Sequence, residues 1–102
     1  MKTISFDFDG VLSTKKGKQW AKDYISKGDK VIIVTARQKS DSAEVYKVAD
    51  ELGIKHSDVH FTNGKDKWPL ISELKPDKHI DNNLEQIQKI REKTNTDGWL
   101  FK

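Results

Sequence analysis

The stretch SFDFDGVLS (residues 5–13) decides the fold, because it places two carboxylates inside an apolar run that reads as a β-strand. Alternation along that strand puts Asp7 and Asp9 on one face and Phe6 and Phe8 on the other. An unpaired carboxylate buried in a central strand would cost several kcal/mol. We therefore expect both carboxylates at the carboxyl end of the strand, facing a crevice that holds a cation.

Strand-like and helix-like segments alternate along the rest of the chain. Residues 31–34 are continuously apolar and β-branched, which is typical of a strand covered on both faces. This alternation predicts one α/β domain, a three-layer Rossmann-like sandwich with a five-stranded parallel sheet and helices on both faces. The expected strands are 3–9, 30–35, 58–61, 79–81 and 98–101, and the expected helices are 19–27, 41–52, 67–74 and 84–93.

Composition narrows the class of protein. The 102 residues include no cysteine, which excludes disulfides and thiolate metal sites. No apolar run is long enough to cross a bilayer, and the N-terminus shows no secretory pattern, so we expect a cytoplasmic protein without a membrane partner. The net charge of +3 is too mild to indicate a nucleic-acid partner by itself, although basic residues concentrate in STKKGK, residues 13–18.

Polar residues also end two other predicted strands. VIIVT ends in Thr35 and HID ends in Asp81, so three of the five strands deliver a polar group to the same sheet edge. Hard oxygen ligands without cysteine point to Mg²⁺ rather than to zinc.

These segments resemble the four motifs of the haloacid dehalogenase-like (HAD) superfamily of phosphohydrolases, in the order of that family. FDFDGVLS resembles the first motif, VIIVTAR the second, NGKDKWPLISEL the third and KHIDNN the fourth. Together they span residues 6–83, nearly the whole chain. The resemblance implies a strand order of 3-2-1-4-5 and a Mg²⁺-dependent phosphatase.

The resemblance also implies roles for the acidic residues. Asp7 would be the nucleophile that forms an aspartyl-phosphate, and Asp9 would be the general acid and then the general base. Mg²⁺ would be held by Asp7, by the main-chain carbonyl of Asp9 and by Asp81. It would screen the repulsion between the carboxylate and the phosphate.

Phosphate binding is assigned in the same way. Thr35 would donate a hydrogen bond to a phosphoryl oxygen, with help from backbone N–H groups near Gly10 and Ala36. Lys67, which directly precedes the third predicted helix, would place a positive charge over the transferred group. Lys65 lies in the preceding loop and is the alternative.

The fourth motif departs from the family pattern, which commonly has two adjacent acids. Here Asp81 is followed by Asn82, which brings no charge. Glu85, one helical turn further on, is a candidate for the second acid. Arg37 is interpreted either as a substrate contact or as a solvated loop residue.

The chain leaves no room for the cap domain that most family members insert. We expect a bare core with a short flap at residues 10–18, open to a phosphorylated small molecule, a nucleotide or a phosphorylated nucleic-acid end. By resemblance, such proteins act on large partners or cover the site by forming oligomers.

Two other function classes stay open at this point. A receiver-like signalling domain uses a similar acidic pocket, but it carries its phosphate on an aspartate after the third strand, and here that strand ends in Phe61–Thr62–Asn63. A non-catalytic or weakly active binding or regulatory protein is the main alternative, because of Asn82 and the missing cap. The three histidines show no metal-ligand spacing, and we expect all of them, His56, His60 and His79, at the surface or at strand edges.

Overall fold

Five parallel strands form one sheet in the computed structural model, which describes all 102 residues. Their order, β3-β2-β1-β4-β5, confirms the predicted order 3-2-1-4-5. It differs from the 2-1-3-4-5 order of receiver domains, which removes the receiver-like alternative. The strands are β1 (Thr3–Phe6), β2 (Lys30–Thr35), β3 (Val59–Phe61), β4 (Lys78–Asp81) and β5 (Asp97–Leu100).

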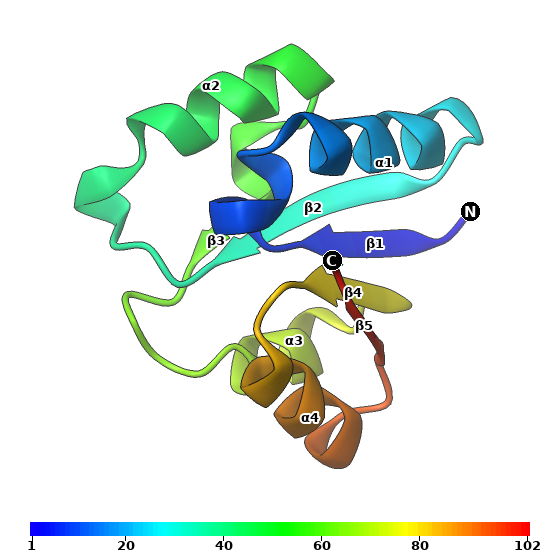
Figure 1. Cartoon of the computed structure of the whole chain (residues 1–102), viewed down its shortest axis with the longest axis vertical. Helices are drawn as coiled ribbons and strands as arrows, with labels where there is room; N and C mark the ends of the chain where they lie inside the picture. The colour runs from blue at the N-terminus through cyan, green and yellow to red at the C-terminus, as the bar shows by residue number, and fades with distance from the viewer.

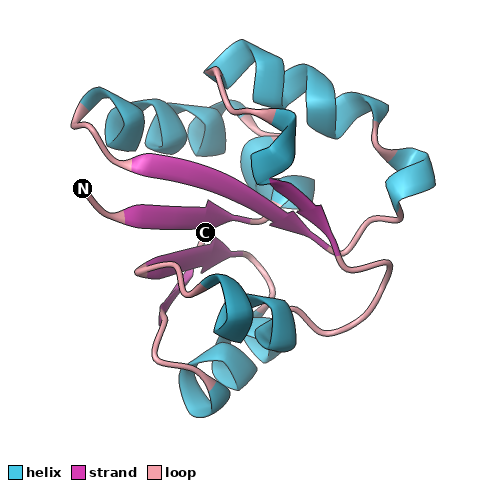
Figure 2. Cartoon of the chain, turned by 180° about the vertical axis from the view of Figure 1, so that it is seen from behind, coloured by secondary structure: helices cyan, strands magenta, loops and turns pink.

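Helices cover both faces of the sheet, as expected, and no segment forms a cap. Figure 1 shows α1 (Lys15–Ser26) and α2 (Ala43–Leu52) on one face, with α3 (Trp68–Leu74) and α4 (Leu84–Lys93) on the other. The same three layers are seen from behind in Figure 2. None of these helices is both long and apolar enough to span a membrane.

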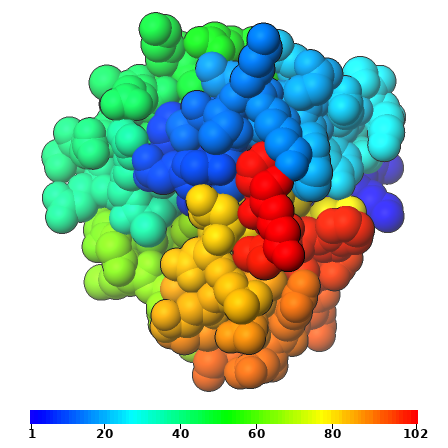
Figure 3. Space-filling model, in the orientation of Figure 1, coloured from blue at the N-terminus to red at the C-terminus, as the bar shows by residue number.

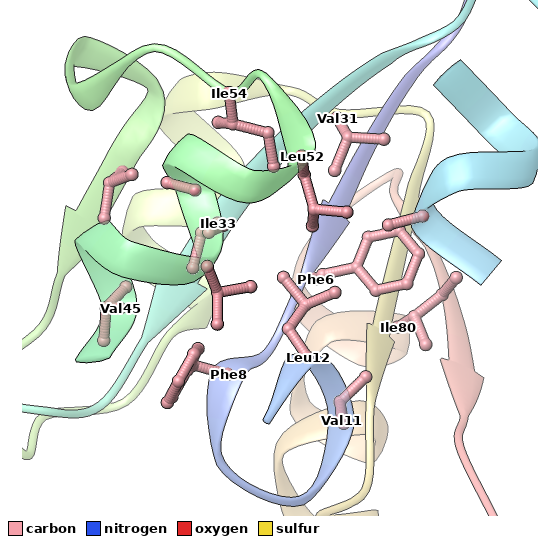
Figure 4. Close-up of a cluster of buried hydrophobic side chains, with 14 of the residues drawn as sticks. Phe6, Phe8, Val11, Leu12, Val31, Ile33, Val45, Leu52, Ile54 and Ile80 are labelled. Carbon is pink, nitrogen blue, oxygen red and sulfur yellow. The ribbon is translucent and has the colours of Figure 1, made fainter. Parts of the chain in front are cut away.

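The core is divided by the sheet into two apolar clusters. The continuous apolar run of β2 explains the division, because Ile33 points to one face while Ile32 and Val34 point to the other. The larger cluster lies between the sheet and helices α1 and α2, and is drawn in Figure 4 around Phe6 and Phe8. The smaller cluster joins β2 to α3 and α4 through Ile71 and Ile90.

The predicted flap at residues 10–18 is wrong. Val11 and Leu12 are completely buried, because their apolar side chains join the larger cluster. The hydroxyl of Thr14 accepts a hydrogen bond from the Gly17 N–H at 3.0 Å, and this cap starts α1 four residues before the predicted position. The lysines of this segment therefore lie on a helix and not on a mobile loop.

Candidate functional site

The candidate site lies at the carboxyl edge of the sheet, where β1 and β4 end side by side. The Asp7 N–H donates a hydrogen bond to the Ile80 carbonyl at 2.9 Å, which holds the two strand ends together. Strand β1 ends at Phe6, three residues earlier than predicted. The chain then bends through a short helical turn, η1 (Phe8–Leu12), in which Gly10 has a φ of 77°.

A buried lysine joins the carboxylates at these strand ends. The Lys67 Nζ lies 2.7 Å from Asp7 Oδ1 and 2.7 Å from Asp81 Oδ2. Lys67 is 3% exposed and Asp7 is 6% exposed, so water screens these ion pairs little. Of the two candidate lysines, Lys67 makes these contacts, whereas Lys65 is exposed on the wall of the cavity above.

One cavity of about 450 Å³ is shared by the three predicted acidic residues, Asp7, Asp9 and Asp81. The chain segments that follow β1, β2, β3 and β4 all contribute to its wall. This convergence is expected for the carboxyl edge of a parallel sheet. The other lining residues are Ala36, Gly64, Lys65, Lys67, Asn82, Asn83 and Gln86.

The two buried carboxylates have opposite protonation tendencies. Burial raises the pKa of Asp7 to about 7, although Lys67 opposes that rise. Burial also disfavours ionisation of Asp81, but hydrogen bonds and the charge of Lys67 outweigh it and hold the pKa of Asp81 well below its usual range. One ammonium thus faces two carboxylates, so the buried group carries one negative charge without a positive partner when both carboxyls are ionised.

Asp9 belongs to the cavity wall, but its carboxylate is held by an arginine. The Arg37 Nε donates to both carboxylate oxygens of Asp9 at 3.2 and 3.0 Å, and Nη2 donates to Oδ1 at 2.8 Å. The guanidinium carbon lies 5.0 Å from the centroid of the Phe8 ring, a cation–π distance. Arg37 is therefore not a free loop residue, because its side chain is partly buried and paired with Asp9.

Two of the predicted phosphate-binding groups, the Thr35 hydroxyl and the Gly10 amide, are already engaged with neighbouring residues of the chain. Thr35 is fully buried, and its hydroxyl accepts the Arg37 N–H at 3.2 Å. The Gly10 N–H donates to the Ser13 hydroxyl at 2.9 Å. A phosphoryl group that used the amide of Gly10 would therefore have to displace Ser13, a contact that the sequence did not indicate.

Of the two residues that could compensate for the missing second acid, Asn82 and Glu85, only Asn82 lines the cavity. The Asn82 amide packs against Gly10, where an added Cβ would lie 2.1 Å from Nδ2. Glu85 instead faces along α4 and forms an ion pair with Lys89 at 3.2 Å.

His79 is not at the surface, and that expectation is wrong. The ring is completely buried, with Nε2 3.0 Å from Asp81 Oδ2 and Nδ1 2.6 Å from the Ser5 hydroxyl. Burial lowers the pKa of His79, so the neutral ring donates from Nε2 and accepts the Ser5 proton at Nδ1. The alternation of the strands could have shown this, because it places His79 and Asp81 on one face of β4.

The oxygen atoms of the site fit Mg²⁺ better than a metal that needs a dense side-chain cage. No three histidine or acidic side chains of the chain converge as a complete metal site. Asp7 and Asp81 supply two carboxylates, and the main-chain carbonyl of Asp9 would be the third oxygen. Mg²⁺ is commonly held by one or two carboxylates and keeps several waters, so this donor set and the unmatched negative charge suit it.

Comparison with solved structures identifies the fold. A universal stress protein solved in complex with cAMP aligns with a TM-score of 0.60 at 16% identity, covering 98% of this chain and 95% of that one. A putative 3-deoxy-D-manno-octulosonate 8-phosphate phosphatase from Vibrio cholerae aligns with a TM-score of 0.59 at 20% identity. The alignment covers 92% of this chain and 62% of the phosphatase chain. No protein-family model and no curated protein sequence matches the chain.

Proposed function

We propose that this chain is a Mg²⁺-dependent phosphomonoesterase of the HAD type, with Asp7 as its nucleophile. The observation that carries the proposal is the buried Lys67 between Asp7 and Asp81, because it places a fixed positive charge beside a carboxylate at the open edge of the sheet. The structural similarity to a phosphatase supports the same reading.

The proposed reaction has two displacements at phosphorus. An oxygen of the Asp7 carboxylate attacks the phosphorus atom, and the bond from phosphorus to the ester oxygen breaks while Asp9 gives that oxygen a proton. Water then attacks the aspartyl-phosphate, Asp9 takes a proton from this water, and the bond between phosphorus and Asp7 breaks to release inorganic phosphate. Lys67 would stabilise charge on the transferred phosphoryl group in both steps.

Asp7, Asp81 and the main-chain carbonyl of Asp9 would hold the Mg²⁺. When bound, the ion would supply the positive charge that the two buried carboxylates lack and would screen their repulsion from an incoming phosphate. Lys67 alone cannot screen this repulsion, because its single positive charge is already shared between Asp7 and Asp81.

A second candidate, a binding protein without useful catalysis, is favoured by one observation. A carboxylate held by three hydrogen bonds from Arg37 has no proton to give, so Asp9 in this arrangement cannot act as an acid. Catalysis therefore requires Arg37 and Asp9 to separate when the substrate enters.

Hydrolysis of p-nitrophenyl phosphate tests the proposal, with and without Mg²⁺ and chelator. Wild type should turn over only with Mg²⁺, and Asp7→Asn should be inactive. Asp50→Asn is the matched control, because the Asp50 side chain is exposed on α2 and contacts His56 rather than the site. A phosphoryl group trapped on the peptide that contains Asp7 would support the covalent step. Activity of Asp7→Asn equal to wild type would refute it.

A further inference from the structure

An aromatic and basic groove lies outside the candidate site, along α1 and the edge strand β5. The part beside Trp99 and Lys78 has a volume of about 260 Å³, and the part along the beginning of α1 has a volume of about 610 Å³. The two parts share Trp20 and Asp23, so they form one surface, which we name the α1–β5 groove. The residues that matter for its chemistry are Trp20, Tyr24, Trp99, Lys16, Lys27 and Lys78.

The aromatic wall of the groove is open to solvent at its outer edge. Trp99 is 46% exposed, and its Nε1 donates to Asp97 at 2.7 Å, which fixes the indole on β5. The Lys78 Nζ lies 4.2 Å from the Trp99 ring centroid and 3.2 Å from the Tyr24 hydroxyl. A cation is thus held between two aromatic rings, one on β5 and one on α1.

The groove carries a positive charge that the protein does not neutralise. Four lysines line it, against one acid, Asp23. Lys15, Lys27 and Lys78 form no ion pair within 4.0 Å of a carboxylate, whereas Lys18 and Lys89 elsewhere on the surface do. On the face drawn in Figure 3, the C-terminal residues lie against α1, where the Lys16 ammonium donates to the Lys102 carbonyl.

We propose that the α1–β5 groove binds single-stranded nucleic acid. The uncompensated positive charge of the groove suits the phosphates of the nucleic-acid backbone, and the partly exposed indole of Trp99 suits an unpaired base, since stacking on aromatic side chains holds single strands without sequence preference. The twelve residues of α1 give the groove a length of about 18 Å, enough for a few nucleotides. An acidic peptide would pair with the lysines but leave the indole unused, and a duplex would keep its bases stacked inside.

The end of the groove at Lys15, where α1 begins, leads toward the candidate site. Lys15 begins α1 directly after Thr14, and Ser13 is hydrogen-bonded to Gly10 in the turn that holds Asp9. A nucleic-acid strand that runs along the groove would therefore have one of its ends beside that turn. This part of the inference rests on the proposed function, and it makes the substrate the phosphorylated end of a nucleic-acid strand.

Fluorescence anisotropy with a labelled oligothymidylate of about 12 nucleotides tests the groove, and a matching oligouridylate separates DNA from RNA. The inactive Asp7→Asn protein is used, so that binding is measured without hydrolysis. Trp99→Ala should weaken binding by about 5- to 150-fold, the effect of one lost base stack. The double variant Lys27→Gln/Lys78→Gln should reduce the slope of log affinity against log salt by about 1.4, the value for two lost phosphate contacts to a single strand.

Matched controls lie on the opposite face of the sheet. The Lys93 ammonium sits 5.0 Å from the Trp68 ring centroid, so Lys93→Gln removes a similar stacked lysine, and this change should leave binding unaltered. Circular dichroism checks that each variant is folded. In the background that keeps Asp7, Trp99→Ala should also hydrolyse p-nitrophenyl phosphate at the wild-type rate.

Four outcomes would overturn the inference: no binding at low salt, equal losses in Lys93→Gln and the groove variants, equal affinity for a duplex, or equal competition by polyglutamate. Failure of the proposed function looks different. In that case p-nitrophenyl phosphate is not hydrolysed, while the oligonucleotide still binds the groove and Trp99→Ala still weakens it.

Discussion

Removal of the buried ammonium is the most direct perturbation of the site, and Lys67→Met achieves it with a side chain of similar length. Asp7 and Asp81 would then face each other without the cation that now lies 2.7 Å from each. Breaking a buried ion pair by removing one partner costs about 3–5 kcal/mol. We therefore expect the free energy of unfolding at pH 8 to fall by that amount.

The loss of unfolding free energy in Lys67→Met should grow with pH, because of the ionisation of Asp7. In wild type the pKa of Asp7 is already raised to about 7, so its ionisation destabilises the fold progressively up to that pH. Without Lys67 this pKa rises further, and between pH 7 and pH 8 the variant loses stability at nearly the full rate, whereas the loss in wild type is nearly complete. The difference between the two proteins should therefore be about 1 kcal/mol larger at pH 8 than at pH 7.

Urea unfolding followed by tryptophan fluorescence measures both effects. Lys65→Met is the matched control, because Lys65 lies on the same cavity wall but is exposed, and it should change stability by less than about 0.5 kcal/mol. Adding Asp7→Asn to Lys67→Met should restore about 1–3 kcal/mol, since one of the two facing charges is then absent. A loss below about 1 kcal/mol that is equal at pH 7 and pH 8 would refute the reasoning.

Four further predictions concern single residues. Asp7→Asn should remove the decline in wild-type stability between pH 4 and pH 7, because that decline comes from a carboxyl whose pKa is raised from 3.8 to about 7; urea unfolding at several pH values checks this. His79→Ala should cost about 1–3 kcal/mol or more by the same method, because it leaves buried partners unsatisfied, whereas exposed His56→Ala should cost little. Gly17→Ala should lower the melting temperature, since its Cβ would lie 1.8 Å from a backbone carbonyl oxygen. Asp9→Asn should slow turnover by about 10²–10⁴-fold, and unchanged turnover would remove Asp9 from its role.

Local sequence patterns predicted most of the fold, because they indicate the same alternation of strands and helices that the structure has. The apolar run of β2 appears as expected, as a strand from Lys30 to Thr35. The start of α1 was missed because KKGK looks like a solvated loop. Its helical state depends on the burial of Val11 and on the close approach of Gly17 to that residue, which are tertiary contacts.

The candidate site shows the same division between local and long-range information. Strand ends predicted that Asp7 and Asp81 would meet, because parallel strands end at a common edge. The partner of Asp9 could not be predicted, since Arg37 is 28 residues away and its direction depends on packing over Phe8. Contacts of this kind depend on rotamers that no spacing rule specifies.

These contacts divide the site into two halves with different freedom to move. The half built from Asp7, Lys67 and Asp81 is buried, and His79 and Ser5 support it from below, so displacing any member would leave an unpaired buried group. The pair of Asp9 and Arg37 lies at the rim, where the Asp9 side chain is 57% exposed, so separating this pair costs less than separating the buried one. An incoming phosphate is a stronger partner for a guanidinium than a single carboxylate, because it carries more charge and more acceptor oxygens. In the proposed reaction, substrate entry would therefore release Asp9 for proton transfer while the buried half keeps its geometry.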